Sequence, residues 1–161
     1  MSKKSKRIPR AVAVNVMETV KHNIATLPSQ VEAYRDVLLK VHVALESLRI
    51  GQVKQADVNH LTGAINMSLA LYTQGVGPDD KETLIEAAKV INNLAARYIN
   101  TGKYVAKGLE IVALRKGVKL HIEQLTVATP PHIQEAMLFV KQNERLNRED
   151  ARRKTLSTVK I

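Results

Sequence analysis

The sequence contains no cysteine and no tryptophan, and its only aromatic residues are Phe139 and four tyrosines. Without cysteine the chain can form no disulfide, no thiolate metal site and no cysteine nucleophile. The scarcity of aromatic rings leaves few side chains on which nucleic-acid bases could stack. The apolar residues make up 45% of the chain. They are mainly Val, Leu, Ile and Ala, a composition that favours a core of packed helices.

Long hydrophobic runs are also missing. No window approaches the roughly 18 consecutive apolar residues that a membrane-spanning helix requires. The apolar stretch that begins at Ala11 is interrupted by Asn15, Glu18 and Lys21 before the core of a secretory signal could form. We therefore expect no membrane partner and a location in the cytoplasm.

Acidic residues are absent from the first ten positions, and near the carboxyl end basic residues outnumber them. Residues 1–10 carry a net charge of +5 and residues 141–161 a net charge of +4, whereas the 130 residues between them carry only +1. Cationic segments attract polyanions through long-range forces that salt screens. A length of 161 residues indicates one domain. We interpret residues 1–10 as a basic amino-terminal arm, 11–148 as a single helical domain and 149–161 as a basic carboxyl-terminal tail.

The apolar residues follow helical spacing nearly throughout, and no strand alternation of convincing length occurs. Prolines and glycines separate the periodic segments. Pro78 followed by Asp79 and Asp80 is typical of a helix start, because proline fits the first turn and acidic side chains favour its positive dipole end. The sequence therefore predicts an all-α fold, a compact bundle of about six helices at residues 11–26, 29–50, 55–74, 79–101, 104–128 and 130–148.

The fifth predicted helix is apolar on two sides. One side carries Val105, Leu109, Val112, Ala113 and Leu120, and the other carries Ile111, Leu114, Val118, Ile122 and Leu125. A helix with two apolar faces lies in the centre of a bundle or against a second subunit. Self-association through residues 104–128 is therefore one of two alternatives.

Basic residues form the candidate binding site. On the fifth predicted helix, Lys103 pairs with Lys107 and Arg115 with Lys119 at a spacing of four, which indicates either a solvated face or a stripe that faces phosphates or acids. The two ends of the chain add further basic residues of the kind that lie along a nucleic-acid backbone. The candidates for contact with nucleic acid or another anionic partner are Lys3, Lys4, Lys6, Arg7, Arg10, Lys103, Lys107, Arg115, Lys119, Arg148, Arg152, Arg153 and Lys154.

Patterns that would support catalysis are weak. His42 and Glu46 share a helix face, but a solvated polar pair explains them better than a metal site. Ser68 lies in an apolar stripe and lacks the turn of a hydrolase nucleophile. Gly75-Val76-Gly77 lacks the further residues of a phosphate-binding loop and reads as a turn between helices. We predict no catalytic residue, no metal and no cofactor.

Several strings resemble a known group of sequences. They are Met1-Ser2-Lys3-Lys4, Asn15-Val16-Met17, the run from Ala44 to Gly51, and the runs Asn66–Leu71 and Gln74–Val76. Together they resemble short, uncharacterised open reading frames of phages and prophages of Gram-negative bacteria, over residues 1 to about 145. The resemblance implies a small accessory protein of a virus or provirus that acts inside a bacterial host cell. It assigns no role to any residue.

Two hypotheses remain. In the first, the chain is a non-enzymatic helical accessory protein that binds a host or viral protein, or another anionic surface, for example as an inhibitor or a host-takeover factor. In the second, it binds nucleic acid without sequence preference by placing its basic tails on phosphates. Sequence-specific DNA reading is disfavoured, because the only helix-turn-helix candidate, residues 55–74, has no basic residues after its start.

Overall fold

The computed structural model describes residues 34–158, with side chains to residue 149. This part of the chain contains helices and no strand, so the all-α prediction is confirmed. The first predicted helix, 11–26, and the basic arm, 1–10, lie outside the described residues. The helices are α2 (Arg35–Arg49), α3 (Gln55–Thr73), α4 (Lys81–Thr101), α5 (Gly108–Val127) and α6 (Pro130–Thr158).

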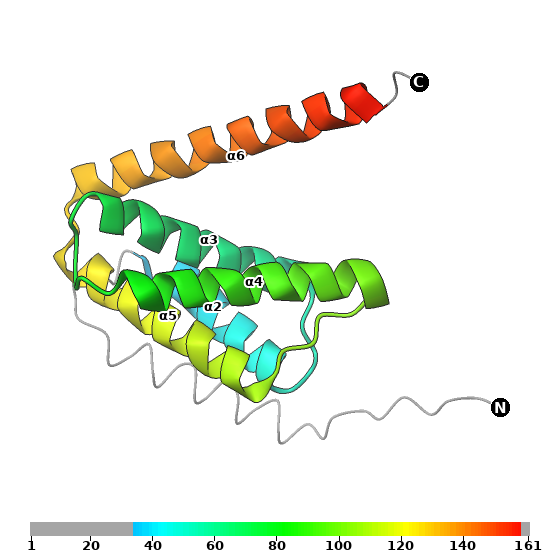
Figure 1. Cartoon of the computed structure of the whole chain (residues 1–161). Coiled ribbons are helices and arrows are strands. Elements are labelled where there is room, and N and C mark those ends of the chain that lie inside the picture. The colour runs from blue at the N-terminus through cyan, green and yellow to red at the C-terminus, as the bar shows by residue number, and fades with distance from the viewer. Residues whose placement is uncertain (1–33, 159–161) are drawn as a thin grey trace.

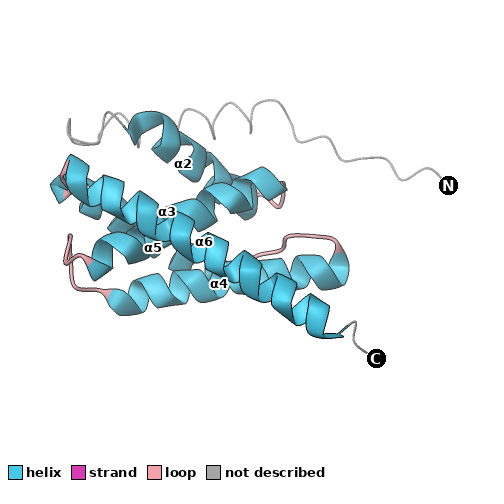
Figure 2. Ribbon diagram, turned by 90° about the horizontal axis from the view of Figure 1, so that it is seen from above, coloured by secondary structure: helices cyan, strands magenta, loops and turns pink. Residues whose placement is uncertain are grey.

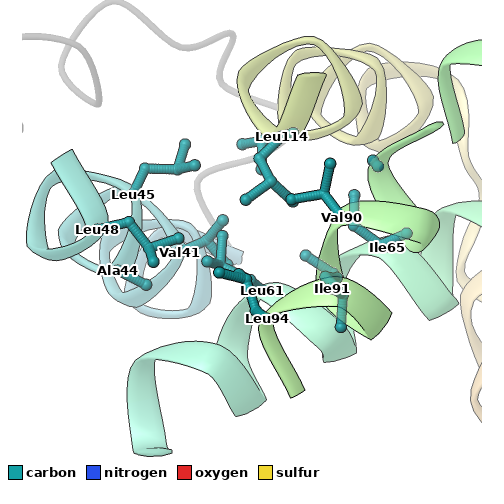
Figure 3. Close-up of a cluster of buried hydrophobic side chains, with 13 residues drawn as sticks. Val41, Ala44, Leu45, Leu48, Leu61, Ile65, Val90, Ile91, Leu94 and Leu114 are labelled. Atoms are coloured by element: carbon teal, nitrogen blue, oxygen red, sulfur yellow. The ribbon is translucent and has the colours of Figure 1, made fainter. Parts of the chain in front are cut away.

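Helices α2 to α5 form a bundle in which α3 contacts every other described helix. The core of the bundle is aliphatic, as the composition predicts, and it draws on all four helices (Figure 3). Leu61 and Ile65 of α3, Leu94 of α4 and Leu114 of α5 are fully buried. Burial of each large apolar side chain stabilises the folded state by about 1.5–3 kcal/mol. These contacts therefore hold the four helices, and the surface residues that they carry, in place.

Helix α4 ends at Thr101 as predicted, but it begins at Lys81, two residues after the predicted start, so Pro78 lies before the first turn. The Asp80 carboxylate accepts hydrogen bonds from the Thr83 backbone N–H at 3.1 Å and from the Thr83 hydroxyl at 2.7 Å, which satisfies a donor of the first turn. At the other end Gly102 adopts a left-handed conformation with φ of 69°. Glycine reaches this region without steric cost.

Helix α5 starts later than predicted. Residues 104–107 form part of the loop from α4, and Lys107 is the residue before the first helical turn. The Glu110 carboxylate accepts the Lys107 backbone N–H at 2.7 Å, and this capping bond sets the start of the helix. Lys103 and Lys107 therefore do not form the helical pair that the spacing predicted.

One of the two apolar sides predicted for α5 is buried inside the bundle. It packs against α2, α3 and α4, and Leu114, Val118 and Leu125 are buried. Gly117 lies against Ala87 of α4 and Ile65 of α3 so closely that an added methyl group would approach them to 2.7 and 2.9 Å. The other apolar side of α5 is not covered in the first turns of the helix, where Leu109 and Val112 are exposed.

The last helix extends beyond the end predicted for it at residue 148. Helix α6 continues to Thr158, through ten of the thirteen residues of the segment interpreted as a tail. The extension contains neither glycine nor proline, and the pair of Arg145 with Glu149, four residues apart, supports the helix where the extension begins. None of the described helices is both long and apolar enough to cross a membrane.

Candidate functional site

The second half of α6 projects from the bundle (Figures 1 and 2). The first half packs on α3, with Ile133 and Ala136 buried and Val140 half-buried. From Lys141 to Glu149 every residue is exposed. One side of this half-helix faces α3 across a pocket of about 280 Å³ lined by Asn143, Glu144 and Asn147. The other side is open to a binding partner.

One face of this half-helix is cationic. Lys141, Arg145 and Arg148 are separated by four and three residues, so their positions lie within about 60° of one another around the helix. Arg152 occupies the next position of the same register. The side chains of Arg145 and Arg148 are 73% and 77% exposed. The stripe thus points its charges into solvent.

Two carboxylates of the same helix pair with this stripe, but loosely. Glu149 lies 3.7 Å from Arg145, and Glu144 lies 3.8 Å from Arg148. Exposed pairs of this kind contribute about 0.3–0.5 kcal/mol. The guanidinium groups therefore remain available to a partner that supplies a better anion.

Apolar side chains accompany the cations. Met137, Leu138, Phe139 and Leu146 are between 45% and 61% exposed. Leu138 precedes Lys141 by three positions, so it lies on the same side of the helix as the basic stripe. Met137 precedes Lys141 by four positions and lies on this side too, whereas Phe139 lies toward α3, where it lines a pocket with Asn66 and Leu69. Exposed Met beside Arg is typical of protein–protein contact surfaces.

The basic residues around α5 belong to a different part of the molecule. Arg115 binds Glu46 of α2 at 3.3 Å, and Glu46 also binds Arg49 at 2.7 Å. Lys119 lies 3.8 Å from Glu123 on its own helix. The structure does not join these residues to the α6 stripe. The remaining candidates, Lys3, Lys4, Lys6, Arg7 and Arg10, and the side chains of Arg152, Arg153 and Lys154, lie outside the described part.

Three buried polar side chains form a cluster that the sequence reasoning missed. Ser68 Oγ of α3 lies 3.0 Å from His121 Nδ1 of α5. Gln124 Nε2 donates to the Ser68 carbonyl at 3.1 Å and to the Val76 carbonyl at 3.2 Å. The two helices and the loop after α3 are thereby tied together. No local pattern could have found this cluster, because 53 residues separate Ser68 from His121.

The cluster is closed to solvent. Ser68 and Gln124 have no exposed surface and His121 has 3%. Burial lowers the pKa of His121 from 6.5 to about 4, because a charged imidazolium would lose its hydration. A serine beside a histidine is the arrangement of a nucleophile and its base, but a substrate would have to reach it. In this geometry the pair stabilises the contact between α3 and α5.

The interpretation of His42 and Glu46 as a solvated pair is wrong. Glu46 has only 17% of its side chain exposed and binds two arginines. His42 is half-buried, its Nε2 atom is enclosed without a hydrogen-bond partner, and burial lowers its pKa although Glu46 opposes that shift. Packing between α2 and α5 draws both residues away from solvent.

The described residues include no group of three or more His, Asp or Glu side chains that could hold a metal ion. Comparisons of the whole chain with protein families, with curated proteins and with solved structures found no match.

Proposed function

We propose that this chain is a non-enzymatic binding protein that holds an anionic partner on the cationic face of α6. The supporting observation is the run from Lys141 to Glu149, which is exposed at every position and carries Lys141, Arg145 and Arg148 on one side. The bundle of α2 to α5 would serve as the rigid base from which this helix extends.

The favoured partner is a protein with an acidic surface. Phosphate backbones need only cations, whereas the cationic face of α6 also carries the exposed apolar side chains of Met137 and Leu138. Arginine and methionine are enriched at protein interfaces. This mixture favours a protein over a polyphosphate.

The proposal also covers the two ends of the chain and the cell in which the protein would act. The arm at residues 1–10 and the basic positions after Arg148 would extend the cationic surface, and residues 11–26 would add a sixth helix to the bundle. The resemblance to phage and prophage reading frames adds the context of a host bacterial cytoplasm. There the protein would act on a host or viral protein as an inhibitor or takeover factor.

We also propose that the chain self-associates through the start of α5. Leu109 is 85% exposed, and Val112 and Val105 are about half exposed. Leu109 and Val112 are three positions apart at the start of α5, and Val105 lies in the loop before it. Exposed apolar side chains on one surface are typical of an interaction site. A second copy of the chain would cover them.

Capture from bacterial lysate tests the identity of the partner. The tagged full-length protein is incubated with lysate before and after complete nuclease digestion, and the bound proteins are compared. The proposal predicts a stoichiometric protein partner that survives digestion. Loss of every partner after digestion would contradict it.

Nucleic-acid binding through the basic tails is the second candidate, supported by the net charges of the two ends. It predicts that random duplex DNA is shifted in electrophoresis and that the affinity falls steeply between low and moderate salt. Deletion of residues 1–10 and 149–161 should abolish the shift. A shift that is insensitive to salt, or that survives this deletion, would rule the candidate out.

A further inference from the structure

A pocket of about 690 Å³ opens between the loop that joins α2 to α3 and the loop that joins α4 to α5. Small-molecule sites range from about 300 to 1,000 Å³, so this pocket has room for a ligand of nucleotide size. It is separate from the α6 stripe, which contributes no residue to its lining.

The charge of the pocket is one-sided. Arg49, Lys54 and Lys103 line it, and no acidic side chain does. Arg49 binds Glu46 through Nε, and within residues 34–149 no hydrogen bond is made by its two terminal nitrogens. The ammonium groups of Lys54 and Lys103 form no ion pair within the same range. The pocket therefore offers three cationic groups to an anion.

A pair of aromatic rings forms part of the wall. Tyr98 and Tyr104 stack with ring centroids 4.3 Å apart and an angle of 10° between their planes. Val53 and Ile111 add apolar surface. These side chains suit a ligand with a flat, weakly polar ring, because a planar ring packs well against aromatic side chains.

The loops around the pocket are held in place before any ligand arrives. The Arg97 guanidinium donates to the Val105 carbonyl at 2.7 Å and grips the Glu110 carboxylate with two bonds, at 2.7 and 2.6 Å. The Tyr104 hydroxyl donates to the Gln55 side chain at the start of α3. A preformed site loses less conformational entropy when it binds.

From these features we infer that the pocket binds a small organic anion made of a planar ring and a phosphate group, of the size of a nucleoside monophosphate. The phosphate would contact Lys54 and Lys103, which form no ion pair within residues 34–149, and the terminal nitrogens of Arg49, whose Nε stays bound to Glu46. Cationic donors of this kind match a doubly charged group. The ring would lie along the wall formed by the tyrosine pair. The inference does not depend on the α6 proposal.

The test is a titration of the full-length, isotope-labelled protein with AMP, followed by amide chemical shifts, with adenosine and inorganic phosphate as separate titrants. We expect saturable shifts at Lys54, Gln55, Lys103 and Tyr104 with AMP, and weaker binding of either fragment alone. The double variant Lys54→Gln/Lys103→Gln should bind AMP at least about tenfold more weakly. Lys54→Arg/Lys103→Arg should restore most of the affinity.

The matched control is Lys81→Gln/Lys89→Gln, which removes the same charge from exposed positions of α4 and should bind AMP as the wild type does. The inference would be overturned by unsaturated shifts, or by shifts centred on α6 instead of the pocket. Unchanged affinity in Lys54→Gln/Lys103→Gln would overturn it as well. Equal binding of AMP and inorganic phosphate would remove the role assigned to the tyrosine wall.

Discussion

The Oγ atom of Ser68 lies 3.0 Å from Nδ1 of His121, inside the contact between α3 and α5. The imidazole must be neutral there, since burial lowers its pKa from 6.5 to about 4. This hydrogen bond joins two helices that are far apart in the sequence. Because His121 is buried in its neutral form, the free energy of unfolding should depend on pH.

Acid should destabilise the protein before its carboxylates titrate. The unfolded chain takes up a proton on His121 near pH 6.5, whereas the folded chain resists protonation until about pH 4. The stabilising contribution is therefore complete above pH 6.5 and is lost as the pH falls to about 4. It amounts to about 3 kcal/mol in the free energy of unfolding, measured by urea denaturation at a series of pH values.

The double variant Ser68→Ala/His121→Leu isolates this effect. It removes both polar partners together and should reduce the pH dependence between 6.5 and 4, while His42, whose pKa burial also lowers, keeps part of it. Ser68→Ala alone leaves the imidazole without its partner and should cost about 1–3 kcal/mol at pH 7. An unchanged slope in the double variant would show that another group carries the acid sensitivity.

Gly117→Ala should destabilise the bundle by about 1–3 kcal/mol, because the new methyl group would meet Ala87 and Ile65 at 2.7 and 2.9 Å. Gly63→Ala on α3 is the matched control. Nothing lies within 4 Å of its added methyl group, so it should stabilise the helix by about 0.5–1 kcal/mol. Equal effects of the two substitutions on the melting temperature would contradict the close packing of α5.

Arg97→Gln should release Glu110. The Arg97 guanidinium, with smaller contributions from the Lys107 backbone N–H and from Asn93, lowers the pKa of Glu110 from 4.5 to about 2. In the variant this pKa should rise toward 4.5, as followed by NMR of the carboxyl carbon. Amides of residues 102–107 should also exchange faster with solvent, because the loop loses its bond to the Val105 carbonyl. A Glu110 pKa that stays near 2 would refute the assigned cause.

Leu109→Glu should abolish self-association. Leu109 is 85% exposed next to Val112, and a charge at this position opposes burial against a second copy. Light scattering at high concentration should give a larger mass for the wild type than for the variant. Val37→Glu, at a 55% exposed position of α2, should associate as the wild type does. A monomeric wild type would contradict the proposed interface.

Much of the fold could be predicted because helical periodicity and capping residues are local signals. The signals at Pro78-Asp79-Asp80 and at Gly102 placed the end of α4 correctly and its start two residues too early. The start of α5 was predicted too early, because apolar spacing continues through Val105, whose carbonyl Arg97 of α4 holds in the loop. The capping bond from the Lys107 backbone N–H to Glu110 marks the start that the structure has. The helix was predicted to end at residue 148 because the residues after it are too polar to pack against the bundle. A polar segment can nevertheless be helical, as this one is.

The candidate site was predicted only in outline. A count of charges locates Lys103 and Arg148 as basic residues, but it cannot show that one lines a pocket and the other projects on an isolated helix. The partners of Arg115 and of His121 come from other helices. Pairings of this kind depend on how α2, α3 and α5 pack, which the order of residues alone does not specify.

The central claim is that the cationic face of α6 holds the anionic partner. The most direct measurement compares capture of the partner from nuclease-treated lysate by the wild type, by Arg145→Gln/Arg148→Gln and by Lys81→Gln/Lys89→Gln. The account predicts that the α6 variant recovers about tenfold less partner and that the α4 variant recovers as much as the wild type. Equal recovery by all three proteins would contradict it.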